Sequence, residues 1–194
     1  MKNRFMLLNS RRLAALVCLG LGVTLFLNSG YMTLKAELAQ YLIARNWHAN
    51  LASGTAQKPW PWADTYVTAK LTFESLDKDR YVMVDTSGES LAFGPGFVLD
   101  GTFNQSQAGY AIAGHRDSHF EIIQNLKTND EITLQRQDQT RIRFRVVSQS
   151  VIDSRYQGLA PADPSQLILI TCYPFNGLVP GGPLRYVVTA HRQS

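Results

Sequence analysis

The residue in this sequence best suited to nucleophilic chemistry is Cys172. The chain has two cysteines, and the other, Cys18, lies in an apolar N-terminal segment that cannot bring it to Cys172 within one molecule. Cys172 ends the apolar run 167–171 and is followed at once by Tyr173 and Pro174. A lone thiol is unusual in an exported domain, because oxidising compartments pair or eliminate cysteines. Cys172 is therefore either a small buried hydrophobic residue or a nucleophile at a strand end.

A cysteine nucleophile needs a proton-transfer partner, and His115 is the histidine best placed for that role. It follows the small residues 111–114, which end a short strand and let a substrate approach closely. His119, in the next loop, is more typical of a structural residue, and His191 lies near the C-terminus. Taken alone, His115 is better explained as a loop histidine with a backbone hydrogen bond.

The developing oxyanion needs a donor, and Arg185 is the candidate. It begins an apolar strand, and the Gly- and Pro-rich loop 173–184 joins that strand to Cys172. If the two strands pair antiparallel, Arg185 lies close to Cys172. By itself, Arg185 is more often a surface arginine. The loop either lines a peptide groove or simply closes the hairpin, and the sequence favours neither.

The N-terminal segment 13–32 is apolar and long enough to cross a bilayer as a helix, which takes about 20 residues. Basic residues precede it, which favours a cytoplasmic N-terminus. A cleaved signal peptide is the alternative, but no clear small-x-small cleavage pattern follows residue 27. We therefore expect an uncleaved, single-pass anchor with the rest of the chain exported.

The net charge of +4 is modest, and four basic residues belong to the N-terminal flank, so nucleic-acid binding is not indicated. No metal-ligand spacing or cofactor motif is found, and we expect neither a metal nor a cofactor. Arg141, Arg143 and Arg145 alternate with apolar residues, as in a half-buried strand with a basic outer face.

The remainder of the chain is expected to be mainly β. Residues 34–47 have helical spacing, residues 49–58 are typical of a linker, and short helical segments are expected at 120–126 and 164–166. The domains predicted are a cytoplasmic tail, a transmembrane anchor, a stalk with linker, and a folded domain, at 1–12, 13–32, 33–58 and 59–194. Strands are expected at 66–73, 80–85, 108–113, 131–135, 141–152, 167–171 and 185–191. Their spacing favours a closed or nearly closed barrel.

Three segments, in this order, resemble the signature segments of the sortases: 114–117 (GHRD), 169–172 (LITC) and 185–188 (RYVV). Ile168 departs from the usual family motif, which has threonine there, and we interpret that change as packing. Further segments are similar to the sortases of marine proteobacteria, and the segment after residue 114 is similar to class D. These further segments are 59–62 (PWPW), 171–175 (TCYPF), 179–186 (VPGGPLRY) and 115–120 (HRDSHF).

The resemblance implies an eight-stranded sortase barrel with short helices and a membrane-anchored cysteine transpeptidase. Cys172 would attack the carbonyl of a partner protein's C-terminal sorting signal, forming a thioacyl-enzyme that an amine acceptor resolves. His115 would be the acid and base, and Arg185 would hold the substrate carbonyl. Thr171, Tyr173 and Pro174 are candidate substrate contacts. The family suggests an inner membrane with the domain in the periplasm.

Two other functions remain open. The same site in a mainly hydrolytic cysteine peptidase would pass the thioacyl group to water. A catalytically idle, membrane-anchored β-domain that binds envelope proteins would need no proximity of Cys172, His115 and Arg185. The sequence leaves open the sorting signal, the acceptor amine, the oligomeric state and the resting protonation state of Cys172 and His115.

Overall fold

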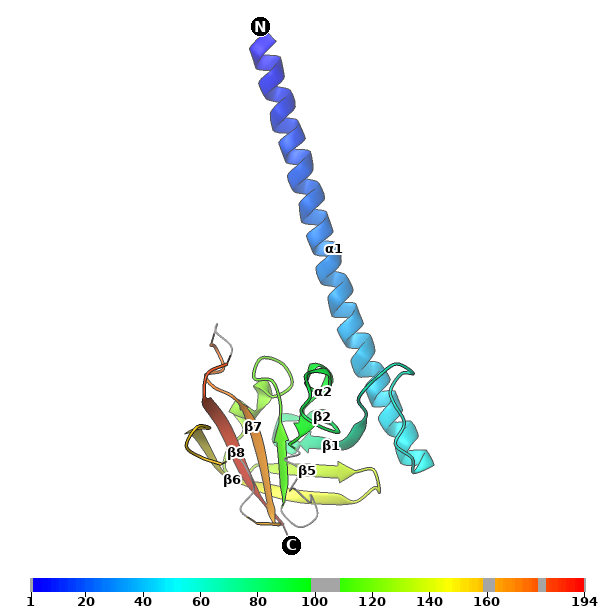
Figure 1. Cartoon of the computed structure of the whole chain (residues 1–194), viewed down its shortest axis with the longest axis vertical. Helices are drawn as coiled ribbons and strands as arrows, with labels where there is room; N and C mark the ends of the chain where they lie inside the picture. Colours follow the sequence, from blue (N-terminus) through cyan, green and yellow to red (C-terminus); the bar gives the residue numbers. More distant parts are fainter. Residues whose placement is uncertain (1, 99–108, 159–162, 178–180, 194) are drawn as a thin grey trace. The chain divides into compact units, whose positions relative to one another are not determined.

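The computed structural model describes residues 2–98, 109–158, 163–177 and 181–193, with side chains described from residue 12 onward. The chain forms two compact units, residues 1–41 and 42–194. The first unit is the N-terminal part of one long helix. The second is a β-barrel together with the end of that helix (Figure 1).

Helix α1 (Lys2–Ser53) is continuous over 52 residues, which contain no proline and many strong helix formers. It ends at Gly54, whose φ of 69° is typical of a left-handed C-terminal cap and whose N–H donates to Asn50. The stretch from Arg12 onward is long and apolar enough to cross a membrane, by length and composition. The large apolar side chains described from Leu13 to Leu34 are exposed in this structure.

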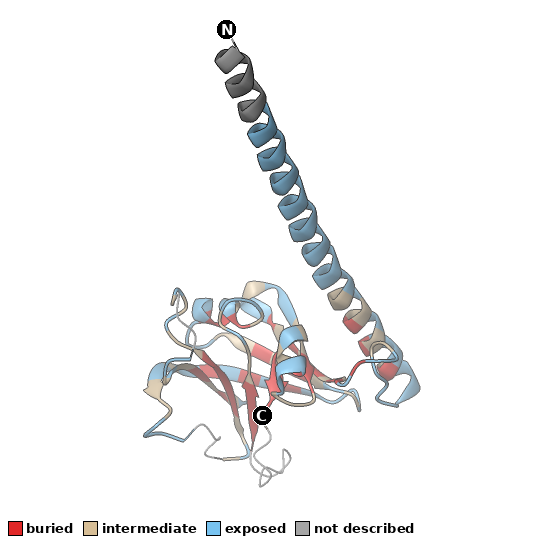
Figure 2. Cartoon of the chain, turned by 45° about the horizontal axis from the view of Figure 1, so that its top comes forward, coloured by how far each residue is buried: buried red, intermediate tan, exposed pale blue. Residues whose placement is uncertain are grey.

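The last turns of α1 belong to the barrel unit. Part of the end of the helix is coloured as buried in Figure 2. Ile43 and Trp47 are buried there with Val67 and Met83. Asn50 is also buried, and its side chain bonds the backbone N–H and C=O of Gln57 at 3.1 and 3.3 Å. Residues 49–53, expected to begin a linker, are helical, and Asn50 ties the segment after the helix back to its last turn.

Within the described residues, eight strands close into a barrel in the order β1-β2-β3-β4-β7-β8-β6-β5, as the resemblance implied. The β2–β3 and β4–β7 pairs are parallel, and the other pairs are antiparallel. The strands are β1 (Val67–Phe73), β2 (Lys78–Met83), β3 (Gly96–Phe97), β4 (Tyr110–Ala113), β5 (Glu131–Arg136), β6 (Arg141–Asp153), β7 (Gln166–Cys172) and β8 (Leu184–Arg192).

Alternate residues along the strands point into the barrel and fill its interior. Strand β1 alternates buried and half-buried residues, and the first half of β6 points Ile142, Phe144 and Val146 inward and its arginines outward. These side chains belong to the main core, which draws residues from all eight strands. The expectation of a solvated basic face on this strand is confirmed.

Two described elements are additional to those expected from the sequence. Helix α2 (Gly88–Phe93) begins after Ser87, whose side chain accepts a hydrogen bond from the N–H of Ser90 at 3.3 Å. Strand β3 pairs with β2 and β4. The short 3₁₀ helices η1 (Glu74–Leu76) and η2 (Glu121–Asn125) complete the described elements, η2 being the helix expected near residue 120.

The helical turn expected at 164–166 is wrong. Gln166 is the first residue of β7, and residues 164–165 form a turn. The Asp163 carboxylate accepts from the N–H of Ser165 at 2.7 Å, and the N–H of Gln166 donates to the Asp163 carbonyl at 3.1 Å. The aspartate therefore closes a tight turn and does not cap a helix.

Candidate functional site

A second apolar cluster lies on the outer face of the barrel, across β4, β7 and β8. Its buried members are Ala111, Ile168, Ile170 and Val187. Because side chains alternate along a strand, these residues share a face with every second neighbour. The next positions on this face, beyond Ile170 and before Val187, are Cys172 and Arg185.

The register places these two residues directly opposite each other. Strands β7 and β8 are antiparallel, and Cys172 pairs with Arg185 as Ile170 pairs with Val187. The N–H of Tyr173 donates to the Leu184 carbonyl at 3.0 Å and extends the ladder by one position. The antiparallel pairing expected from chain order is therefore present, and it brings the thiol and guanidinium residues side by side.

His115 follows β4 on the other side of β7. In the parallel β4–β7 pair, Ala113 pairs with Ile170, and the N–H of Gly114 donates to the Ile170 carbonyl at 3.0 Å. His115 lies two residues beyond Ala113, as Cys172 lies two beyond Ile170. The three predicted residues thus lie at the same end of the barrel, on neighbouring strands. His115 follows the end of β4, Cys172 ends β7, and Arg185 lies at the start of β8. Cys172 and Arg185 are half-buried, and His115 is exposed.

Gly114 is tightly confined just before His115. A Cβ atom at this position would lie 2.8 and 2.9 Å from two ring carbons of Phe120, which is fully buried in the core. The Phe120 N–H in turn donates to the His115 carbonyl at 3.0 Å. The sequence after β4 therefore folds back on itself and fixes the backbone on both sides of the histidine.

Thr171 is buried, and its hydroxyl donates to the Gly114 carbonyl at 2.7 Å. This bond gives it a role in holding the two strand ends together, beside the substrate contact predicted from sequence. Tyr173 is half-buried and Pro174 exposed. The Tyr173 ring packs edge-on against Phe175, with ring centroids 6.4 Å apart.

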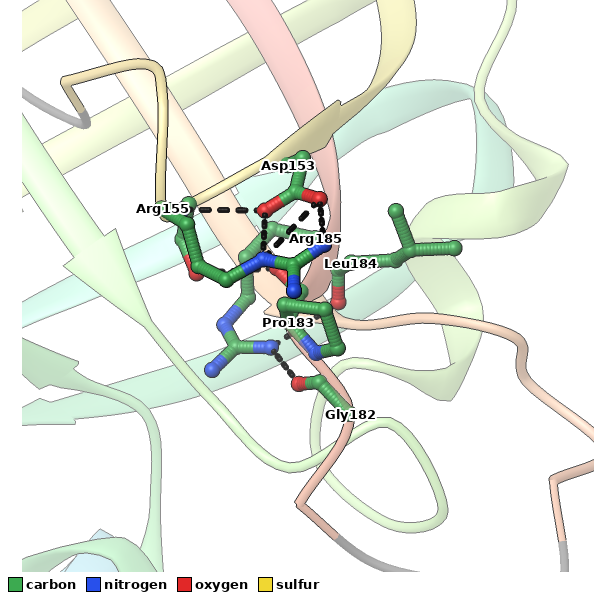
Figure 3. Close-up of polar contacts among 7 residues, drawn as sticks. Asp153, Arg155, Gly182, Pro183, Leu184 and Arg185 are labelled. Carbon is green, nitrogen blue, oxygen red and sulfur yellow. Dashed lines mark hydrogen bonds and ion pairs between the residues drawn. The ribbon is translucent and has the colours of Figure 1, made fainter.

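The guanidinium of Arg185 is held by the loop that precedes it (Figure 3). Its Nη1 donates to the carbonyls of Gly182 at 2.6 Å and Leu184 at 2.9 Å. The intervening Pro183 carbonyl accepts from the hydroxyl and the N–H of Ser154, at 2.8 and 3.0 Å. The end of β6 thus supports the segment on which Arg185 rests.

His119 is half-buried in the loop that follows His115. Burial lowers the pKa of His119, a hydrogen bond with the Ala92 backbone opposes this, and Arg80 and His115 lower the pKa further. Nε of Arg80 donates to the His119 carbonyl at 2.8 Å. Arg80 carried no signal in the sequence, because the contact spans 39 residues and depends on the fold.

Comparison with known proteins identifies the family. The model of the sortase domain family matches residues 71–193, which include all three predicted catalytic residues. The chain belongs to the sortase family. The curated Sortase D of Bacillus subtilis (strain 168) is similar to this sortase, with 23% identity over 124 residues covering 63% of this chain and 62% of that protein. This relative agrees with the class D resemblance.

Solved sortases share the fold. A lid mutant of sortase A from Corynebacterium diphtheriae has a TM-score of 0.57 and 20% identity, covering 84% of this chain and 95% of that one. The catalytic domain of B. anthracis SrtD has a TM-score of 0.53 and 23% identity, with 66% and 88% covered. The chain spans about 62% of the length of the curated relative.

Among the residues that the structure describes, no group of three or more His, Cys, Asp or Glu side chains could hold a metal ion.

Proposed function

We propose that this sortase is a cysteine transpeptidase, with Cys172 as nucleophile, His115 as acid and base, and Arg185 as the group that holds the substrate carbonyl. The observation that carries the proposal is the register of the barrel. Cys172 and Arg185 are direct partners, and His115 follows the strand on the opposite side of β7. An idle β-domain has no need of this convergence, so the register favours an enzyme.

The reaction has two halves. The Cys172 sulfur attacks the carbonyl carbon of the sorting signal, the C–N bond breaks, and His115 gives the leaving amine its proton. An amine acceptor then attacks the thioester, His115 takes its proton, and the C–S bond breaks. Water in place of the amine gives hydrolysis, which is the second candidate outcome at the same site.

Arg185 can hold both its loop and a substrate. A guanidinium has five N–H donors, and the bonds to Gly182 and Leu184 use those of Nη1. We assign the Nε and Nη2 donors to the substrate carbonyl and its oxyanion.

The apolar part of α1 would anchor the enzyme in the inner membrane as a single pass. The domain would lie outside the cytoplasm, where exported proteins with C-terminal sorting signals are accessible. The partners are then a protein substrate, an amine acceptor and the membrane. We propose the division into tail, anchor, stalk and catalytic domain at the boundaries given above. The compact unit that holds the catalytic domain begins earlier, at residue 42, so the second part of the proposed stalk folds with the barrel.

The test is product analysis by mass spectrometry. Source cells producing the full chain are given biotin-labelled triglycine, and labelled envelope proteins are identified with their new C-termini. Label joined to a partner protein supports transpeptidation, and a shortened partner without label, with or without added amine, supports hydrolysis. Product that persists after Cys172→Ala contradicts both, and Cys18→Ala is the matched control that retains activity.

A further inference from the structure

Both neighbours of His115 are bonded to the segment that carries Cys172. On one side, Gly114 bonds Ile170 and Thr171, as described. On the other side, Nη2 of Arg116 donates to the carbonyl of Gly177 at 2.6 Å. The Arg116 contact joins residues 61 positions apart, and it reaches the loop between β7 and β8.

The Gly177 backbone is shaped to receive this guanidinium. A Cβ atom on Gly177 would lie 2.9 Å from Nη1 and 3.2 Å from Nη2 of Arg116, inside ordinary van der Waals contact. Gly177 is not among the residues with positive φ, and a Cβ there would push the end of the Arg116 side chain away from its present position. A hydrogen bond from a cation to a half-buried carbonyl is also stronger than a neutral one.

Gly177 is itself held close to the nucleophile. Its N–H donates to the Pro174 carbonyl at 3.2 Å, closing a turn that begins two residues after Cys172. Within that turn Phe175 packs edge-on against Tyr186 of β8, with ring centroids 5.2 Å apart. The turn is thus fixed to the β7–β8 hairpin, and Arg116 fixes the histidine segment to the turn.

We infer that Arg116 is a positioning residue for the proposed reaction, which holds His115 against Cys172 by bridging to Gly177. The inference rests on the proposed function and adds to it a residue that touches neither substrate nor reacting atoms. Arg116 and Gly177 act as one contact, so losing either partner should have the same effect, and losing both should add little.

The experiment measures the pH–rate profile of Cys172 alkylation by iodoacetamide in the full chain in detergent, read at the Cys172 peptide by mass spectrometry. This probe needs no sorting signal. His115→Ala reports how the profile changes when the imidazole is absent. We expect Arg116→Gln and Gly177→Ala to move the profile toward that of His115→Ala, and the double variant to move it no further than the larger single change.

Two further variants separate positioning from charge and from general effects. Arg116→Lys keeps a cation and one donor and should fall between wild type and Arg116→Gln. Arg143→Gln removes an arginine from the exposed face of β6 and should leave the profile unchanged. On an identified substrate, Arg116→Gln should lower kcat by up to about 100-fold with little change in KM.

The outcomes are distinct. If His115→Ala moves the profile and Arg116→Gln does not, the positioning role is overturned and the proposed function stands. If His115→Ala leaves it unchanged, Cys172 and His115 are not coupled and both proposals fail. If the effect of Arg116→Gln vanishes well below its melting temperature, the arginine stabilises the fold only, and the positioning role is again overturned.

Discussion

Replacing Gly114 by alanine should damage both the fold and the site. The new Cβ would lie 2.8 Å from a Phe120 ring carbon, so the ring must retreat by about 0.6 Å (3.4 − 2.8) to reach ordinary contact. The ring is fully buried, and the Gly114 backbone is held through its N–H by Ile170 and through its carbonyl by Thr171. Neither side can give way without losing packing or hydrogen bonds.

Overpacking of this kind costs roughly 1–3 kcal/mol. For a unit of this size we expect the melting temperature to fall by about 2–12 °C, at roughly 2–4 °C per kcal/mol. Any displacement passes directly to His115, and an error of about 1 Å in a reacting group can lower the rate about 100-fold. The assays are thermal unfolding and the alkylation rate of Cys172.

The control is Gly88→Ala, where a Cβ meets no atom within 4 Å and alanine favours the first turn of α2. A double variant, Gly114→Ala with Phe120→Leu, should be less destabilised than the sum of its singles, because leucine leaves room for the new methyl group. If Gly114→Ala melts and reacts as Gly88→Ala does, the tight contact with Phe120 is not what fixes the histidine segment.

Three other predictions follow from single contacts. Thr171→Val leaves the carbonyl of half-buried Gly114 without its donor and should cost about 0.5–1.5 kcal/mol in urea unfolding, whereas Thr171→Ser should stay close to wild type. Trp47→Ala should cost about 3–5 kcal/mol, because the ring is buried between the last turns of α1 and the barrel. Trp62 is 79% exposed, so Trp62→Ala should change the melting temperature little. Equal losses in the two variants would contradict the packing of the last turns of α1 on the barrel. Because the folded state favours neutral His119 and lowers its pKa, the stability it contributes is complete above about pH 6.5 and is lost as pH falls below that value, by at most about 1.4 kcal/mol per unit. His119→Gln should therefore lose less stability than wild type between pH 7 and 5.5, and parallel urea midpoints would show that His119 is not the group responsible.

The strands were predictable because the sequence repeats with the period of a sheet. Strand β6 alternates arginine with apolar residues, and the structure confirms it almost to the residue. Strand β3 was not predictable, because two residues carry no period and become a strand only by pairing with Met83 and Ala113. Helix α2 was missed for a related reason, since Ser87 at its start signals a turn and a helix cap equally well.

The site was predictable where chain order fixes geometry. A hairpin that leaves Cys172 and returns at Arg185 must set the two side by side, and it does. The position of His115 beside Cys172 could be predicted only from the family resemblance, because nothing in the local sequence shows that β4 and β7 are adjacent parallel strands. The contacts of Arg116 and Arg80 were beyond sequence reasoning, because long side chains find loop carbonyls only after the loops have folded.

The central claim is that Cys172 forms a thioacyl bond that an amine resolves. The most direct measurement is intact-mass analysis of the full chain isolated from source cells with and without hydroxylamine. We expect an acyl adduct on the Cys172 peptide that hydroxylamine removes and that persists longer in His115→Ala once formed. It should be absent in Cys172→Ala and present in Cys18→Ala. An adduct that survives hydroxylamine, or labelled product formed by the Cys172→Ala protein, would contradict it.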